Sequence, residues 1–435
     1  MSSNKVIKNA SWIIAGKIVQ SLIGLIISML TARYLGPSNY GTINYAVAIV
    51  SFMAPILRLG IDNILVRELI EDKNKEGTVM GSAILLNLIS SFLCIIGIIA
   101  FVSIMNRGDT ETIIVCSLYS IQLIFQSFEL LRFWFQAKLL SKYTTIVSLI
   151  GYLVVTAYRI FLLATQKNVY WFALSYSVEN LVLAVLQLVF YRRYSDQPLQ
   201  FSKEVSIRLL NAGKYYIISD LMVNIFAQTD KIMLKNIISS DATAYYSAAL
   251  TCASMTGFVF TAILDSYRPI IFESKKDNES RFELNLIRLF AIIIYLSLLQ
   301  SIVMTIFANL IIKILFGADY MPAVSALRIV VWYTTFAYVG SIRNMWILSE
   351  GKQKYLLPIN GMGALLNIIL NFIFISRYGA NGAAVASLIT QIFTNVITGM
   401  IIAEIRPVNR YMFQSLNPKY ILNTISTVWN EMKHR

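Results

Sequence analysis

About a dozen apolar segments, each long enough to cross a lipid bilayer, run through this sequence. A membrane-spanning helix needs about 20 mostly apolar residues, and a helix satisfies all its backbone hydrogen bonds within lipid. The connections between the segments are short, so we expect an all-α membrane protein without a folded domain outside the bilayer. The pattern predicts about twelve spans, near residues 10–32, 41–60, 79–103, 112–131, 144–165, 170–191, 211–238, 244–271, 287–307, 325–348, 355–376 and 382–404.

The basic residues of the chain are distributed very unevenly. The 435 residues carry a formal net charge of +14, but charged residues make up only 14% of the sequence, against about 25% in a soluble protein. In a soluble protein this excess would suggest nucleic acid, but in membrane proteins Lys and Arg collect in the cytoplasmic loops. An even number of spans places both termini on one side, which we therefore predict to be cytoplasmic, and nucleic-acid binding is excluded. The opposite loops carry few basic residues, namely Arg33, Arg107, Lys167, Lys235 and Arg377.

The sequence offers no set of residues for a metal centre. Its one histidine, His434, lies at the extreme C-terminus, which excludes a histidine-based zinc site or catalytic triad. Cys94, Cys116 and Cys252 fall in or beside apolar segments without metal-site spacing, so we expect buried free thiols. No cleavage site follows the first apolar segment, and we predict a retained helix rather than a removed signal peptide. No cofactor is expected.

Polar side chains recur at helical spacing in several spans, where they share one helix face. The Ser, Thr, Gly and Ala members are also explained as contacts between membrane helices. A charge in mid-span costs at least about 2.5–3.5 kcal/mol and should face water or another charge, so the charged members predict a polar path for an anionic substrate. Snorkelling competes for Arg58 and Arg268 near span ends, and pairing with Asp230 competes for Lys231. The basic candidates are Lys17, Arg58, Lys214, Lys231, Arg268 and Arg343.

The pattern of spans predicts two related halves. Ala15-Gly16-Lys17 in the first span recurs as Ala212-Gly213-Lys214 in the seventh, and a polar loop near 192–208 separates two sets of six spans. Parallel repeats of this kind bind substrate near the bilayer midplane, between the halves. We predict an N-terminal six-helix lobe over 1–200, a C-terminal six-helix lobe over 201–410 and a cytoplasmic amphipathic tail over 411–435.

Several short motifs, in order along nearly the whole chain, resemble one family. The sequence is similar to the Wzx-type polysaccharide flippases of the multidrug/oligosaccharidyl-lipid/polysaccharide (MOP) exporter superfamily. Gly36-Pro37 and Gly379 are also ordinary loop residues. The motifs are Arg33-Tyr34-Leu35-Gly36-Pro37 with Tyr40-Gly41, Arg67-Glu68, Trp134-Phe135-Gln136-Ala137, Thr229-Asp230-Lys231-Ile232-Met233-Leu234, Tyr246-Ser247-Ala248-Ala249, Leu315-Phe316-Gly317 with Tyr320, and Tyr378-Gly379-Ala380-Asn381-Gly382-Ala383-Ala384.

The resemblance implies two six-helix lobes arranged in a V around a central cationic cavity. It implies translocation, without catalysis, of an undecaprenyl-pyrophosphate-linked oligosaccharide repeat unit from the cytoplasmic to the outer face of the bacterial inner membrane. The six basic candidates would then contact the pyrophosphate. The implied partners are the lipid-linked oligosaccharide, membrane lipids, a polysaccharide polymerase and a chain-length regulator.

Coupling to protons or sodium and three rival functions stay open at this point. A drug or metabolite exporter of the same superfamily would usually have a more acidic cavity. A polymerase or ligase acting on the same lipid carrier would usually have a long external loop, and a peptidoglycan-precursor flippase is usually a longer chain. The candidate ligands for a coupling ion are Glu179, Asp220, Asp230 and Asp265.

Overall fold

The computed structural model describes residues 3–422 and, among their side chains, those of residue 20 and of residues 23–422 except 73, 141, 219 and 226. The described residues contain helices and no β-strand, which confirms the predicted all-α class. Contacts divide the chain into two compact units, Met1–Ala244 and Tyr245–Arg435, and each is described separately.

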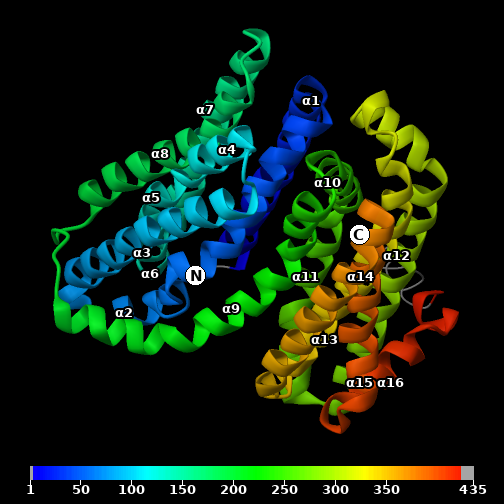
Figure 1. Cartoon of the computed structure of the whole chain (residues 1–435). Helices are drawn as coiled ribbons and strands as arrows, with labels where there is room; N and C mark the ends of the chain where they lie inside the picture. The colour runs from blue at the N-terminus through cyan, green and yellow to red at the C-terminus, as the bar shows by residue number, and fades with distance from the viewer. Residues whose placement is uncertain (1–2, 423–435) are drawn as a thin grey trace. The chain divides into compact units, whose positions relative to one another are not determined.

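The first unit consists of long helices joined by short turns. The segment from α4 to α6 is one span interrupted by small changes of helix type. Figure 1 labels the α-helices of this unit, which are α1 (Ser3–Arg58), α2 (Leu65–Glu71), α3 (Glu76–Met105), α4 (Thr110–Ser120), α5 (Gln122–Gln126), α6 (Leu131–Ala137), α7 (Ser141–Ala164), α8 (Val169–Tyr194) and α9 (Lys203–Ile237). Its 3₁₀ turns are η1 (Ile61–Asn63), η2 (Lys73–Lys75) and η3 (Ser127–Leu130).

The second unit has the same character, and α10 (Ser240–Ser254) crosses the boundary into it. Near its end the last long span changes into a π-helical turn, η6 (Phe393–Ile397). The α-helices that follow α10 are α11 (Gly257–Asp277), α12 (Glu279–Leu315), α13 (Ala323–Ser349), α14 (Leu356–Ile392), α15 (Thr398–Ile401) and α16 (Arg406–Ser415). The 3₁₀ turns are η4 (Ala318–Tyr320), η5 (Gln353–Tyr355) and η7 (Ala403–Ile405).

Glycine interrupts two helices where the sequence predicts a loop between spans. Gly36 in α1 has φ 71° and ψ 172°, and Gly379 in α14 has φ 53° and ψ −129°. Positive φ is accessible to glycine at little cost, and Pro37 follows the first break with a fixed φ that suits the start of the next helix. Each of these two long helices therefore contains two predicted spans.

Length and composition identify fewer candidate spans than the twelve predicted. Among the described residues, eight helices or helical segments are long and apolar enough to cross a membrane, and nine if α10 and α11, which meet at a bend of 47°, form one span. The amide- and charge-bearing α9 is not among the eight. A multi-pass membrane protein is confirmed, while the count of twelve stays a prediction.

Helix α9 belongs to the first unit by its contacts, although it begins the predicted second lobe. The predicted lobe boundaries at 200 and 410 stay predictions. The structure describes the predicted tail, 411–435, only up to residue 422, and α16 ends within it at Ser415.

Candidate functional site

Two close contacts hold α9 and the start of α10 against α1 in the first unit. A Cβ atom at Gly41 would overlap the carbonyl oxygen of Ser240, and one at Gly213 would overlap that of Leu59. Gly60, beside the second contact, has φ +66° and would also clash if it carried a side chain. Small residues let membrane helices approach this closely. The glycines therefore fix the start of α10 and the N-terminal part of α9 to the two ends of the span that follows Gly36.

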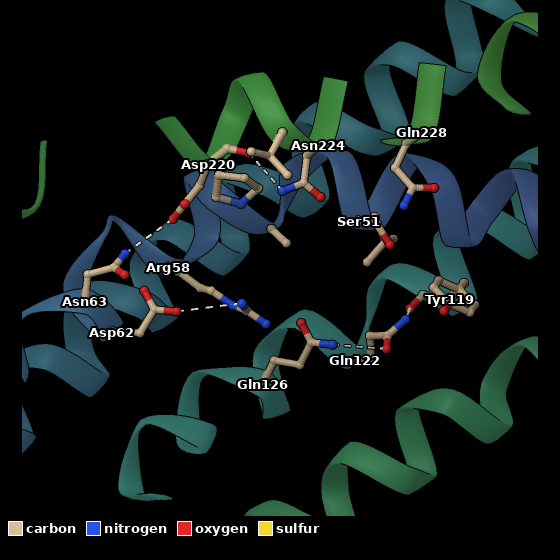
Figure 2. Close-up of a pocket in the computed structure, with 14 residues that line it drawn as sticks. Ser51, Arg58, Asp62, Asn63, Tyr119, Gln122, Gln126, Asp220, Asn224 and Gln228 are labelled. Carbon is tan, nitrogen blue, oxygen red and sulfur yellow. Dashed lines mark hydrogen bonds and ion pairs between the residues drawn. The ribbon is translucent and has the colours of Figure 1, made fainter. Parts of the chain in front are cut away.

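Between these contacts the helices separate and leave a pocket of about 490 Å³, which is within the range of about 300–1,000 Å³ for small-molecule sites. Three walls surround it: the end of α1 with η1, the junction of α4 and α5, and the middle of α9 (Figure 2). The lining residues are Val50, Ser51, Ala54, Pro55, Arg58, Asp62, Asn63, Tyr119, Gln122, Gln126, Asp220, Val223, Asn224 and Gln228.

The α1 wall carries its charged groups at the point where the helix ends. Leu59 and Gly60 both have positive φ, 52° and 66°, so the chain leaves the helix there and turns into η1. The turn brings Asp62 back toward Arg58, with 3.7 Å between the Asp62 Oδ2 and Arg58 Nη1 atoms. The Asp62 side chain is 13% exposed and that of Arg58 is 42% exposed. An ion pair therefore lies at this end of the pocket (Figure 2).

The α4–α5 wall is built around the Gln122 amide. Its Nε2 atom donates to the carbonyl oxygen of Tyr119 at 3.0 Å. Its Oε1 atom accepts from Gln126 Nε2 at 3.2 Å and from Asn180 Nδ2, on α8, at 3.1 Å. These three bonds fix the orientation of the amide. The wall thus presents pre-arranged amide groups to the pocket.

The α9 wall presents Asp220, Asn224 and Gln228, which share one helix face because they are four residues apart. Asn224 Nδ2 donates to the backbone oxygen of Asp220 at 3.0 Å. Asp220 Oδ2 accepts from Asn63 Nδ2, on η1, at 3.4 Å. All three side chains lie on α9 facing α1 in Figure 2. This polar stripe explains why α9 is less apolar than the other long helices.

Comparisons with known proteins identify the family. A family model described as "Polysaccharide biosynthesis protein" matches residues 6–275, more than half of the chain. The chain belongs to the polysaccharide biosynthesis protein family. The predicted resemblance is therefore confirmed. A second family model, MatE, matches residues 216–373.

Two relatives of this family member are similar over most of their length. A putative O-antigen transporter of Shigella flexneri is 24% identical over 403 residues, which cover 88% of this chain and 94% of the relative. The capsular polysaccharide biosynthesis protein CapF of Staphylococcus aureus is 20% identical over 88% of this chain and 96% of its own length. A transporter in polysaccharide biosynthesis is thus the coarse description that these similarities support.

Solved structures of similar fold confirm the fold of this family member. The lipid II flippase MurJ in an inward closed conformation has a TM-score of 0.75 at 13% identity, with 98% of this chain and 100% of that chain covered. An inward-facing multidrug resistance MATE family transporter of the MOP superfamily has a TM-score of 0.69 at 14% identity, with 89% and 96% covered. At these identities the likeness concerns the fold alone.

The structure places four of the six predicted basic residues on α1 and α9 of the first unit. Arg58 lines the pocket. Lys214 is exposed, with its Nζ atom 5.2 Å from the centre of the Tyr215 ring. Lys231 is partly buried and follows Asp230 in α9. The side chain of Lys17, on α1, lies outside the described residues.

The other two predicted basic residues lie in the second unit. Arg268 forms an ion pair with Asp265, 3.7 Å apart, and both side chains are more than half exposed. Arg343, on α13, is 3% exposed and donates to the carbonyl oxygen of Thr394 and, at 2.8 Å, to Asn344 Oδ1. Contact between any of the six and a substrate stays a prediction.

The four predicted ion ligands have separate surroundings. Asp220 lines the pocket, Asp230 is 5% exposed on α9, and Asp265 pairs with Arg268. Glu179 pairs with Arg159, whose Nη2 atom is 3.3 Å from Glu179 Oε2. The structure does not gather these four residues into one cluster, and MOP-type ion coupling through any of them stays a prediction.

Sequence reasoning missed the amides of the α4–α5 wall and the arginine of α7. Gln122 and Gln126 are four residues apart within a predicted span, so the same helical spacing that identified the other polar stripes would have found them. Arg159 lies in mid-span, where a charge is as costly as at the six predicted basic residues. Its guanidinium donates to Ser175 and Glu179, and its Cζ atom lies 4.3 Å from the Tyr176 ring centre.

Proposed function

We propose that this protein moves undecaprenyl-pyrophosphate-linked oligosaccharide repeat units from the cytoplasmic to the outer face of the bacterial inner membrane, and that it does so by alternating access without a chemical step. The observation that carries the proposal is the pocket of polar walls within a membrane-spanning unit. Sugar hydroxyls lose their hydrogen bonds to water in hydrocarbon, at a cost of about 2–7 kcal/mol per uncompensated group. The amides and charges of the pocket would replace those bonds, while the polyprenyl tail stays in lipid.

The membrane potential would favour this direction of transport. One elementary charge crossing 100 mV is worth about 2.3 kcal/mol. A pyrophosphate with about two negative charges, moved outward from a negative interior, would gain about twice that amount. We expect the basic candidates other than Arg58 to contact the pyrophosphate as the sugar moves.

Complementation tests the proposal. The full chain is expressed in a bacterium that lacks its own flippase and makes a defined lipid-linked glycan, and surface polysaccharide is measured against membrane protein level. We expect polysaccharide to return with the wild-type chain, to fall with Lys17→Ala and to be largely kept with Lys17→Arg. A panel of defined glycans in which none reaches the surface, although the protein is present in the membrane, would refute the proposal.

A second candidate function follows from the charges of the pocket. Asp62 and Asp220 outnumber Arg58 among its lining residues, as a site for organic cations would require. The same strain therefore also receives ethidium, and its accumulation is compared with and without the chain. Active extrusion of ethidium, together with absence of surface polysaccharide, would show that the protein is a multidrug exporter rather than a flippase.

A further inference from the structure

Two acceptor atoms of the lining residues are left without a partner, and they bear on the kind of ligand that the pocket can hold. The described residues satisfy both ends of the Gln122 amide and one hydrogen each of the Asn63, Asn224 and Gln126 amides. Asp62 Oδ1 and Gln228 Oε1, by contrast, are buried without a hydrogen-bond partner in the described part of the chain. Both atoms are acceptors. A buried acceptor without a donor is unfavourable, so a ligand that supplies donors would remove the penalty if the side chain turns its oxygen into the pocket.

The charges of the pocket also favour a ligand that supplies hydrogen-bond donors. Its lining residues include one guanidinium, on Arg58, and two carboxylates, on Asp62 and Asp220. The guanidinium already lies beside one of the carboxylates, so the formal charge that remains is negative. A phosphate or carboxylate group offers only acceptors and adds negative charge. The pocket is therefore poorly matched to the pyrophosphate end of the proposed substrate.

We infer that this pocket binds sugar rings through their hydroxyl or amino hydrogens, and that it prefers neutral and amino sugars to sugars that carry a carboxylate. The inference rests on the proposed function, of which it specifies one site. The Asp62 and Gln228 side chains turn their unpartnered oxygens toward the sugar and accept from it. The Gln122 and Gln126 amides form a fixed wall, and Asp220 attracts an amino group. The pyrophosphate is then held elsewhere, by basic residues outside this pocket.

Site-specific labelling measures occupancy of the pocket directly. The three native cysteines, Cys94, Cys116 and Cys252, are buried, so Ser51→Cys adds one reactive thiol among the lining residues. The full chain in lipid nanodiscs is treated with a maleimide in the presence of one of four probes. Two are sugars, neutral N,N′-diacetylchitobiose and the amino sugar disaccharide of glucosamine, and two are anions, digalacturonic acid and inorganic pyrophosphate. Thr165→Cys, at an exposed position of the same unit, reports non-specific effects on labelling.

We expect the glucosamine disaccharide and N,N′-diacetylchitobiose to slow labelling at Ser51→Cys and not at Thr165→Cys, and the two anions to have little effect. Calorimetry on the chain without an introduced cysteine should rank the affinities of the four probes in the same order. Gln228→Leu should weaken binding of both sugars about tenfold, the loss expected for one hydrogen bond that must be made in a buried site. Asp62→Asn should narrow the difference in affinity between the glucosamine disaccharide and digalacturonic acid. Glu111 is an exposed carboxylate on α4 that does not line the pocket. Glu111→Gln is therefore the matched control, and it should change neither the affinity for the sugars nor the difference between the two disaccharides.

Equal or stronger protection by pyrophosphate or digalacturonic acid would overturn the inference, and so would absence of protection by both sugars. These outcomes are separate from failure of the proposed function. A chain that restores surface polysaccharide but shows no sugar protection retains the proposed function and loses this site. A chain that shows sugar protection but restores no polysaccharide retains the site and loses the proposed function.

Discussion

The two units contain polar groups inside membrane-spanning segments, but they use them in opposite ways. The pocket of the first unit encloses about 490 Å³, and two of its lining residues, Asp62 and Gln228, each hold a buried oxygen without a hydrogen-bond partner among the described residues. Around Arg343 in the second unit, side chains fill the space and donate to backbone oxygens. Arg343 donates to the oxygen of Thr394, and Asn409 on α16 donates to that of Val396 at 2.7 Å. Polar residues of the membrane-spanning segments thus surround a pocket in one region and join helices to one another in the other.

The second region is organised around the π-helical turn η6. A π-turn inserts one residue into a helix and changes which backbone groups pair, so two of its carbonyl oxygens receive side-chain donors here. Glycines make room for its side chains: a Cβ atom at Gly340 would overlap Asn395, and one at Gly363 would overlap Thr394. These contacts bind α13, α14 and α16 of the second unit to the turn, and they leave little freedom for a substrate at Arg343.

The largest effect on stability is expected from Arg343→Ala. The change removes the donor to the Thr394 oxygen, at about 1–3 kcal/mol for a buried group, and it leaves a cavity at a site that is 3% exposed. Large-to-small core changes cost about 2–5 kcal/mol. We expect a large drop in membrane protein level and in the thermal unfolding temperature in detergent.

Arg343→Met distinguishes an architectural role from a role in substrate binding. Methionine fills irregular buried space without a charge, so it should recover most of the folded protein that Arg343→Ala loses. If the comparison of the two regions is correct, it should also recover transport. Well-folded Arg343→Met protein without transport would instead support the predicted pyrophosphate contact at Arg343.

Gly41→Ala is expected to have the next largest effect, because its methyl group would meet the backbone oxygen of Ser240 rather than a movable side chain. Overpacking costs about 1–3 kcal/mol, and separation of α9 from α1 would alter the pocket. We expect a lower unfolding temperature together with lower transport. Gly97→Ala is the control, because nothing lies within 4 Å of a Cβ atom at that position of α3. Alanine loses less conformational entropy than glycine when a helix forms, so this variant should be as stable as the wild type or slightly more stable.

The sequence predicts the helical class because apolar length alone requires it, and it predicts the two glycine breaks because Gly36-Pro37 and Gly379 are strong local signals. The partners of the charges do not follow from periodicity. Arg58 and Arg343 both lie in stripes of polar residues, yet one lines a pocket and the other contacts a π-turn. That difference depends on contacts between segments far apart in the sequence, such as Arg343 with Thr394, and helical spacing carries no information about them.

Gln122→Leu should affect transport more than stability. The Gln122 side chain makes hydrogen bonds to Tyr119, Gln126 and Asn180, and Asn180 keeps a second acceptor in the backbone oxygen of Tyr176. We expect a loss of about 1 kcal/mol in the free energy of unfolding and a severalfold loss of surface polysaccharide at equal protein level. Gln414→Leu, on α16 of the second unit, is the matched control, and equal transport by the two variants would contradict a role for the amide wall.

The smallest effect is expected at the Asp109–Lys235 ion pair of the first unit, where Lys235 Nζ lies 2.9 Å from Asp109 Oδ2. Partial burial tends to raise the pKa of Asp109, but hydrogen bonds from Thr112 and Lys235 outweigh burial and hold the pKa below its usual value of 3.8. A carboxylate with a lowered pKa stabilises the folded state above its unfolded pKa, and this contribution is lost as the pH falls through the folded value.

Asp109→Asn isolates this charge effect, because Asp109 is the N-cap of α4 and accepts from the Thr112 backbone N–H at 3.0 Å, and asparagine caps a helix as well as aspartate does. Since the Asp109 side chain is 40% exposed, we expect a difference of only about 0.2–1 kcal/mol. The unfolding temperatures of wild type and variant should differ near pH 6 and converge as the pH falls below about 4, because the carboxylate gains its proton first in the unfolded chain and only at lower pH in the folded one. A difference that stays constant down to pH 3 would mean that the variant acts through the helix cap rather than through Lys235.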